Sequence, residues 1–332
     1  MNKLIFSIIF CALLACIVIS KETELNKRGI SVAGGTDIDY DNQFPHLVSL
    51  QYSRDGVKYQ HFCGGSVIAS RWILTAAHCL SVDGMDVSKV RVLAGVANQD
   101  IDCSNPSSKC VISKVARKIV HPNYNSQYIR NDIAMLELTS DLPLGTASQN
   151  RVQRIGIEGG QIPFKTLVTL TGWGRTSDSS NDLPSKAQKA YMPLQQSSVC
   201  NQQGLGMESP YQLCVGEGNR INSCQGDSGG PLHWIRQSGN SYTMGLIGLV
   251  SYGPQGCGRQ GAFGVYTNTT YWINYVKNYV PDLQVVYMNS NTNPTNPTNP
   301  TNPGSCNCPT QQQSVQQDGI EMPRVIKIEE TH

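Results

Sequence analysis

Two short motifs bring together residue types that can do nucleophilic chemistry. Ser228 lies in Gly226-Asp227-Ser228-Gly229-Gly230-Pro231, and His78 lies in Thr75-Ala76-Ala77-His78-Cys79. A serine hydroxyl is a poor nucleophile at neutral pH and needs a base within hydrogen-bond reach, which a histidine can supply. Glycines on both sides of the serine let the backbone approach a carbonyl group and point amide hydrogens at it. The two motifs together favour acyl transfer.

A third motif supplies a carboxylate. Asp132, in Asn131-Asp132-Ile133-Ala134-Met135-Leu136, lies between the other two motifs in the chain. Such a carboxylate can hold a histidine in the tautomer that accepts the serine proton. Each motif alone has an ordinary explanation, such as a packed histidine or an aspartate that caps a turn. Three motifs in this order are hard to obtain by chance, so we interpret them as a catalytic set.

The three motifs resemble those of the chymotrypsin/trypsin-like serine proteases, and the resemblance covers residues 32–280. It implies a serine endopeptidase in which His78 is the general base, Asp132 the orienting carboxylate and Ser228 the nucleophile. It also implies that the amides of Gly226 and Ser228 form the oxyanion hole. Protein or peptide substrates and protein protease inhibitors are the partners implied, with no cofactor and no metal. A non-catalytic homologue that acts as a binding protein is the rival interpretation.

Strands are expected to position these residues. The 332 residues include 31 glycines and 17 prolines, and few helix-like runs, which favours an all-β chain. The resemblance implies two antiparallel six-stranded Greek-key β-barrels, over residues 32–150 and 151–270. Apolar residues at helical spacing predict a short C-terminal helix over 271–280, which stops at Pro281. The peptidase domain is therefore expected to span 32–281.

The N-terminus predicts secretion. Residues 1–20 combine a basic start with a short apolar run, which is typical of a secretory signal peptide, and residues 21–31 follow as a propeptide. A membrane anchor and a bacterial lipidation signal at Cys16 are the alternatives. We expect a secreted, extracellular protein that leaves the membrane once the signal is removed.

The C-terminus has a different composition. Residues 282–305 contain Thr-Asn-Pro repeats, in which each proline removes an amide donor, so this segment is expected to be an extended linker. Residues 306–332 form a tail of unknown role, which we also expect to be disordered. The 26 basic and 24 acidic residues nearly cancel, and no basic run suggests nucleic-acid binding. We expect a monomer.

Ten cysteines remain after the signal peptide, and in a secreted protein they predict disulfides rather than metal ligands. The resemblance implies three pairs, namely Cys63–Cys79, Cys200–Cys214 and Cys224–Cys257. Cys103 and Cys110 most simply pair with each other. They lie where trypsins carry a calcium loop, but Val96 takes the place of the expected glutamate, and the loop offers few carboxylates. We expect a local disulfide in place of a metal.

Activation is the first point where the chain departs from the family pattern. The resemblance implies that a new N-terminal ammonium pairs with Asp227, whose carboxylate would be costly to bury alone. The matching segment begins at Val32 and follows Ser31, whereas the dibasic site at Lys27-Arg28 would leave three extra residues. We predict that the mature chain begins at Val32 and that the precursor is a zymogen.

The primary specificity pocket is the second departure. Asn222 stands six residues before Ser228, where trypsins have an aspartate, so a substrate Lys or Arg would be desolvated without a countercharge. Gly253 and Gly264 match the pocket walls and leave it open. Ser251-Tyr252-Gly253 resembles the strand that pairs with the substrate backbone. A chymotrypsin-like preference for bulky neutral residues is predicted, with cleavage after Lys or Arg as the alternative.

One glycosylation acceptor is predicted. Asn268-Thr269-Thr270 fits the required pattern, whereas proline blocks the repeated Asn-Pro-Thr triplets.

Overall fold

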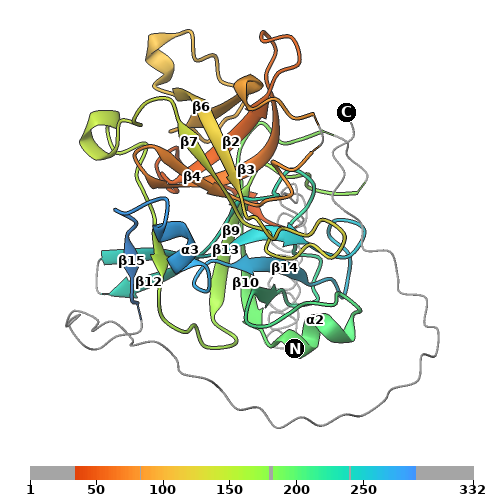
Figure 1. The fold of residues 1–332 in the computed structure, drawn as a ribbon. Helices are drawn as coiled ribbons and strands as arrows, with labels where there is room; N and C mark the ends of the chain where they lie inside the picture. Colours follow the sequence, from red (N-terminus) through yellow and green to blue (C-terminus); the bar gives the residue numbers. More distant parts are fainter. Residues whose placement is uncertain (1–33, 83, 179–181, 239–240, 289–332) are drawn as a thin grey trace, which may run out of the picture.

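The computed structural model describes residues 34–82, 84–178, 182–238 and 241–288, and these form two β-barrels with few helices (Figure 1). The predicted signal peptide, propeptide, Val32, Thr-Asn-Pro repeats and tail lie outside the described residues. None of the helices in the described ranges is long and apolar enough to cross a membrane.

The first barrel closes in the order β2-β3-β4-β7-β6-β5, and every pairing in it is antiparallel. Its strands are rich in β-branched and apolar residues, which favour the pleated, buried environment. Val48, Ile73 and Leu136 lie at the centre of its core and are fully buried. The strands are β2 (Leu47–Tyr52), β3 (Gln60–Ala69), β4 (Trp72–Thr75), β5 (Val90–Ala94), β6 (Val111–Val120) and β7 (Ala134–Leu138).

The second barrel is a ring in the order β12-β9-β10-β11-β14-β13, which a β12–β13 pairing closes. All pairings in the ring are antiparallel. Leu170, Met192 and Ile247 are fully buried or nearly so in its core. The strands are β9 (Leu167–Gly172), β10 (Gln188–Gln195), β11 (Gln212–Val215), β12 (Pro231–Ser238), β13 (Ser241–Tyr252) and β14 (Gly264–Asn268). The predicted fold of two six-stranded barrels is confirmed.

Three short strands extend the second ring. β1 (Thr36–Asp37) pairs antiparallel with β10, although it lies in the range expected to form the first barrel. β8 (Gly156–Glu158) pairs parallel with β13 and also parallel with β15 (Val285–Val286). These parallel pairings are the exceptions to the antiparallel pattern expected from the sequence.

The C-terminal helix is shorter than predicted. α3 spans Ile273–Lys277 rather than 271–280. Val276 within it and Val280 just after it are fully buried. Beyond Pro281 the chain pairs with the sheet through β15, and Met288 is buried. Residues 282–288 therefore belong to the fold, although this segment was expected to begin the linker. The other helices are α2 (Ser197–Gln202) and the 3-10 turns η1 (Val87–Lys89), η2 (Pro106–Ser108) and η3 (Gly145–Ser148).

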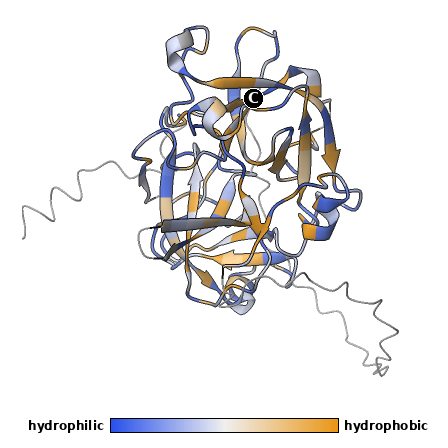
Figure 2. Cartoon of the chain, turned by 90° about the vertical axis from the view of Figure 1, so that its left-hand side faces the viewer, coloured by the Kyte–Doolittle hydropathy of each residue, from blue (hydrophilic) through white to orange (hydrophobic). Residues whose placement is uncertain are grey.

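An apolar layer joins the two barrels. Leu74 and Ile133 from the first barrel pack in one cluster with Leu246 and Leu249 from β13 and with Val276 from α3. Figure 2 shows that hydrophobic residues concentrate along the strands of both barrels, while the connecting loops are mostly hydrophilic. Because buried apolar area stabilises this contact, the barrels hold a fixed relation to each other.

Four disulfides cross-link the described residues. They are Cys63–Cys79, Cys103–Cys110, Cys200–Cys214 and Cys224–Cys257, as predicted from the sequence.

Candidate active site

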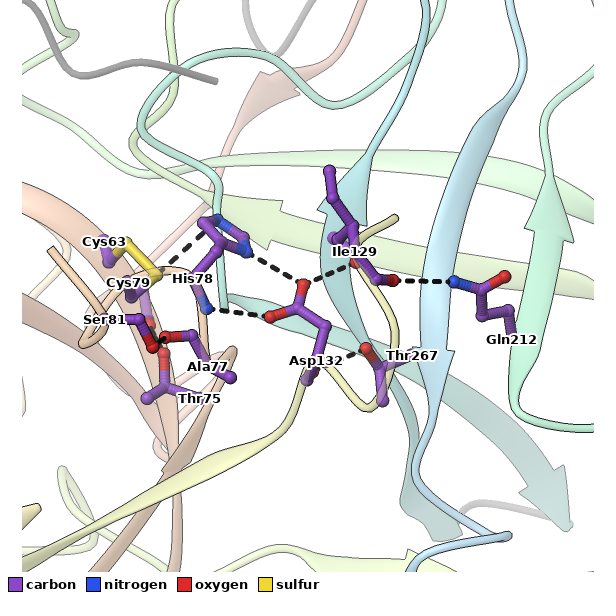
Figure 3. Close-up of polar contacts among 12 residues, drawn as sticks. Cys63, Thr75, Ala77, His78, Cys79, Ser81, Ile129, Asp132, Gln212 and Thr267 are labelled. Atoms are coloured by element: carbon purple, nitrogen blue, oxygen red, sulfur yellow. Dashed lines mark hydrogen bonds and ion pairs between the residues drawn. A yellow bond between two sulfur atoms is a disulfide. The ribbon is translucent and has the colours of Figure 1, made fainter. Parts of the chain in front are cut away.

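His78 and Asp132 meet because their two strands are neighbours. β4 ends at Thr75, three residues before His78, and β7 begins at Ala134, two residues after Asp132, while Thr75 pairs with Ala134. The Nδ1 atom of His78 lies 2.8 Å from Oδ2 of Asp132, and the backbone amide of His78 donates to Oδ1, also at 2.8 Å (Figure 3). Two hydrogen bonds thus fix the carboxylate against the Nδ1 edge of the imidazole and the backbone amide of the same residue.

The second barrel holds Asp132 from the other side. Ser251 Oγ donates to Asp132 Oδ2 at 2.5 Å, and Thr267 Oγ1 donates to the backbone carbonyl of Asp132 at 2.7 Å. Asp132 is 2% exposed, and this burial by itself raises the pKa of the carboxyl. The charge of His78 and the hydrogen bonds from His78 and Ser251 outweigh burial and leave the pKa of Asp132 lowered. The carboxylate therefore stays ionised at neutral pH.

An ionised Asp132 selects the tautomer of His78. A carboxylate only accepts hydrogen bonds, so Nδ1 must carry the proton that joins the two groups. The lone pair of the neutral ring then lies on Nε2, which is the atom that could accept a proton from a hydroxyl. The side chain of His78 is 18% exposed, so it borders solvent.

The backbone around Ser228 is held against the first barrel. The amide of Gly64 donates to the carbonyl of Ser228 at 2.8 Å. Gly229 has φ 69°, and a Cβ atom there would lie 2.1 Å from Thr75 Oγ1 and 2.9 Å from the amide nitrogen of Ala76. Only glycine fits this approach, which brings the chain beside Ser228 to the end of β4, close in sequence to His78.

The hydroxyl of Ser228 is not yet engaged. Ser228 is 3% exposed, and its Oγ atom has no hydrogen-bond partner among the residues that the structure describes. The structure thus brings His78 and Asp132 into direct contact and forms no hydrogen bond from Ser228 to either. Catalytic hydrogen bonds are often long or absent without substrate and tighten when substrate binds.

The turn that precedes Ser228 has its amides available. Within the described ranges, no hydrogen bond has the backbone amide of Gly226 or Ser228 as its donor. Gly226 has φ 97°, and its carbonyl accepts a hydrogen bond from Nε2 of His61 at 2.8 Å. Holding the carbonyl on one side leaves the amide edge of the turn available for an anionic oxygen.

His61 is a site residue that sequence reasoning missed. Since Nε2 donates to Gly226, Nδ1 accepts from the hydroxyl of Ser49, at 2.7 Å. Burial lowers the pKa of His61 to about 4, although the bond to Gly226 opposes this shift, so the ring stays neutral. Its only sequence signal is its position two residues before Cys63, which is bonded to the cysteine that follows His78. Thr267 gave no such signal.

Asp227 is fully buried beneath the same turn. Its carboxylate accepts from the amides of Gly174, at 2.8 Å, and Cys224, at 2.9 Å. Burial raises the pKa of Asp227 to about 7, against the lowering effect of the bonds from Cys224 and Gly174. Burying an ionised carboxylate costs free energy, and a cation next to Asp227 would offset most of this cost.

Asn222 is the residue that the sequence predicted at the base of the primary pocket. Its Oδ1 atom accepts from the amide of Ser223 at 2.8 Å, and the residue is buried. A Cβ atom on Gly264 would lie 2.8 Å from Oδ1 of Asn222, and one on Gly253 would lie 3.9 Å from its Nδ2. The structure therefore brings Asn222 and both predicted wall glycines together.

One group of potential metal ligands occurs in the described part of the chain, and it consists of Cys63, His78 and Cys79. Both sulfur atoms are used in the Cys63–Cys79 disulfide, so neither is a thiolate that could bind a metal. This disulfide instead supports the chain next to His78.

Comparison with known proteins identifies the family. The family model for trypsin matches residues 33–278, which is most of the chain. Pig trypsin is 33% identical over 238 residues, covering 71% of this chain and 90% of that protein. Human chymotrypsin-like elastase family member 1 is 32% identical over 263 residues, covering 77% of this chain and 95% of that protein. Melanization protease 1 of Drosophila melanogaster is 33% identical over 272 residues, or 76% of this chain and 66% of that longer protein.

The chain therefore belongs to the trypsin family. It is a serine endopeptidase, a hydrolase that acts on protein or peptide substrates.

Proposed function

We propose that this endopeptidase works through a triad of Ser228, His78 and Asp132. His78 Nε2 takes the proton from Ser228 as its oxygen attacks the substrate carbonyl carbon, and it then gives that proton to the leaving amine. Water hydrolyses the resulting acyl-enzyme by the reverse proton route. Asp132 stabilises the imidazolium, and the amides of Gly226 and Ser228 stabilise the oxyanion.

The single observation that carries this proposal is the 2.8 Å contact between His78 Nδ1 and Asp132 Oδ2, reinforced by Ser251. A histidine oriented by a buried, ionised carboxylate is what activation of a serine requires. The available amides at Gly226 and Ser228 support the same chemistry.

Labelling with a fluorophosphonate tests the triad. The mature protein should react at Ser228, Ser228→Ala should not react, and His78→Ala should react far more slowly. Ser223→Ala is the matched control and should label like the parent. A properly folded, mature parent protein that fails to label would indicate a non-catalytic binding protein instead.

We further propose a primary pocket for bulky neutral residues. Asn222 carries no charge, and its oxygen is already used by the amide of Ser223, so nothing at the base would neutralise a substrate Lys or Arg. Cleavage of a peptide library should occur after large apolar or aromatic residues. Exclusive cleavage after Lys and Arg would support the trypsin-like alternative. Asn222→Asp should shift the preference toward basic residues.

Activation is proposed to place the new ammonium of Val32 next to Asp227. The raised pKa of about 7 and the lack of a cation beside this carboxylate in the described ranges support such a partner. N-terminal sequencing of active enzyme should begin at Val32, and a start at Gly29 would contradict it. Secretion is proposed from the predicted signal peptide together with four disulfides.

Three further expectations stay proposals. A monomer is expected by gel filtration, and inhibition by protein protease inhibitors is expected in activity assays. Asn268 is half-buried in β14, with its Nδ2 donating to the carbonyl of Pro210 at 2.8 Å. Glycan attachment at Asn268 would appear as a mass shift that enzymatic deglycosylation removes.

A further inference from the structure

Ile129, three residues before Asp132, has an unusual backbone conformation. Its φ is 49°, in the left-handed region that β-branched residues rarely adopt, and its side chain is 5% exposed. Such a conformation is strained and persists only where the surroundings enforce it. Asn131 also has a positive φ, 54°, but asparagine tolerates this region better.

Gln212, the first residue of β11, contacts the carbonyl of this strained residue. Its Nε2 atom donates to the carbonyl oxygen of Ile129 at 3.2 Å (Figure 3). Its Oε1 atom accepts from the hydroxyl of Tyr252 at 3.3 Å and from the amide of Glu208 at 2.8 Å. One side-chain amide therefore links the loop that precedes Asp132 to the end of β13.

A charge pair supports the same connection. Arg130, which follows Ile129, forms an ion pair with Glu208, whose backbone carbonyl also accepts from the amide of Gln212 at 3.1 Å. Residues 208–212 thus contact two successive residues of the loop before Asp132, namely Ile129 through Gln212 and Arg130 through Glu208.

The two residues that Gln212 links also pack together. Ile129 and Tyr252 belong to one buried cluster, which includes Val265 and the Cys200–Cys214 disulfide. Tyr252 lies between Ser251, which donates to Asp132, and Gly253, where a Cβ atom would lie 3.9 Å from Nδ2 of Asn222. Tyr252 and Ile129 therefore pack beside residues that the proposed function places in the active site.

We propose that Gln212 is a positioning residue for extended substrates. By fixing Ile129 against Tyr252, it sets the surface that receives the side chains next to the residue held in the Asn222 pocket. This inference rests on the proposed function, because it assumes that the substrate backbone pairs with residues 251–253. Gln212 does not touch the reacting atoms, so its effect should depend on substrate length.

Kinetics on two substrates test the inference. One is a single-residue ester that occupies only the primary pocket, and the other is a tetrapeptide amide with the same residue at the cleaved bond. Gln212→Met removes all three side-chain hydrogen bonds at similar length. Its loss of kcat/KM on the tetrapeptide should exceed its loss on the ester by about tenfold. Tyr252→Phe, which removes one of these bonds, should show a smaller difference of the same sign.

Gln99→Met is the matched control. Gln99 Nε2 donates to the carbonyl of Pro184 at 2.8 Å, so this variant loses the same kind of bond outside the candidate site. It should change both substrates equally. Equal effects of Gln212→Met on the ester and the tetrapeptide would overturn the inference, because a merely structural role lowers both alike.

Two further outcomes are decisive. If Gln212→Met does not fold, Tyr252→Phe decides, and an absence of any difference between its two substrates overturns the inference. Fluorophosphonate labelling of the parent at Ser228 is measured in the same preparation. Absence of labelling would reject the proposed triad, whereas labelling with equal substrate effects would reject only the role of Gln212.

Discussion

The rings of His46 and His233 pack edge to face in the interior, with their centroids 5.2 Å apart. His46 immediately precedes β2 and His233 lies in β12, so the pair joins the two barrels. Nε2 of His46 and both ring nitrogens of His233 have no hydrogen-bond partner among the described residues. Phe44 covers His233 at 4.9 Å. Among the described residues, no ion pair joins either ring to a carboxylate that would stabilise a positive charge.

The first prediction is that this histidine pair makes the fold sensitive to acid. Burial lowers the pKa of His46 to about 3, and burial, followed by the charge of His46, lowers the pKa of His233 well below 6.5. In the unfolded chain both would titrate near 6.5, so below that pH the unfolded state binds more protons and stability falls. Each histidine lowers the free energy of unfolding by about a further 1.4 kcal/mol per pH unit below 6.5.

Denaturant unfolding between pH 7 and pH 4.5 measures this effect. His233→Leu should flatten the pH dependence relative to the parent, because one group no longer titrates on unfolding. His121→Leu is the comparison, at a histidine that is 8% exposed rather than fully buried, and it should flatten the pH dependence less. Equal slopes for the parent and for His233→Leu would show that the interior pair does not control acid stability.

The second prediction concerns the tautomer of His78. Asp132→Asn keeps the size of the side chain but presents an amide that no longer requires the proton on Nδ1. The value of kcat should fall by about 10⁴-fold, as in the serine-protease triad from which this mechanism is known, with the fold retained. Asp141→Asn, at an exposed ion pair with Arg71, should leave kcat unchanged. A fall below tenfold for Asp132→Asn would contradict the assigned role.

The third prediction is that residues 282–288 stabilise the peptidase domain. Glu158 is fully buried, and its two oxygens accept from the amide of Met288 at 3.1 and 3.3 Å. Leu283 and Met288 are also buried, so removing them forfeits about 3–6 kcal/mol of apolar burial.

Thermal unfolding of two shortened chains tests this contribution. A chain that ends after Met288 should unfold at the same temperature as the full-length protein, whereas a chain that ends after Pro281 should unfold at a clearly lower temperature. The packing of β15 against β8 requires a glycine at position 156, since a Cβ atom on Gly156 would lie 2.8 Å from Val286 Cγ1. Gly156→Val should therefore lower the unfolding temperature, though by less than removal of residues 282–288 does. Identical melting of both shortened chains would refute the prediction.

The fourth prediction is that calcium does not stabilise the loop closed by Cys103–Cys110. Asp102 is used by the amide and hydroxyl of Ser104, and Asp100 is used by the hydroxyl of Ser185. Too few carboxylates remain there for a cation that prefers six or more oxygen ligands. A chelator should leave the melting temperature unchanged, and a large drop would show that a metal supports the loop.

The resemblance of three motifs to a known family implied the two barrels, and the candidate catalytic residues could be named because each sits in a motif whose neighbours have a physical role. Gly226 and Gly229 are needed for positive φ, and Cys79 must follow His78 to brace it. The pairing of β15 with β8 could not be predicted, because two valines after a proline carry no periodicity. The burial of His46 and His233 was equally hidden, since it arises only when strands from both barrels pack together.

The bond from Gly64 to the carbonyl of Ser228 has a consequence for how the enzyme could be divided. The proposed base His78 and its carboxylate Asp132 belong to the N-terminal half of the molecule, while the proposed nucleophile Ser228 belongs to the C-terminal half. Two separately produced fragments, split between β7 and β8, would each be inert, and hydrolysis would return only on their reassociation. Measured proteolytic activity would therefore report directly how much of the two fragments has reassociated.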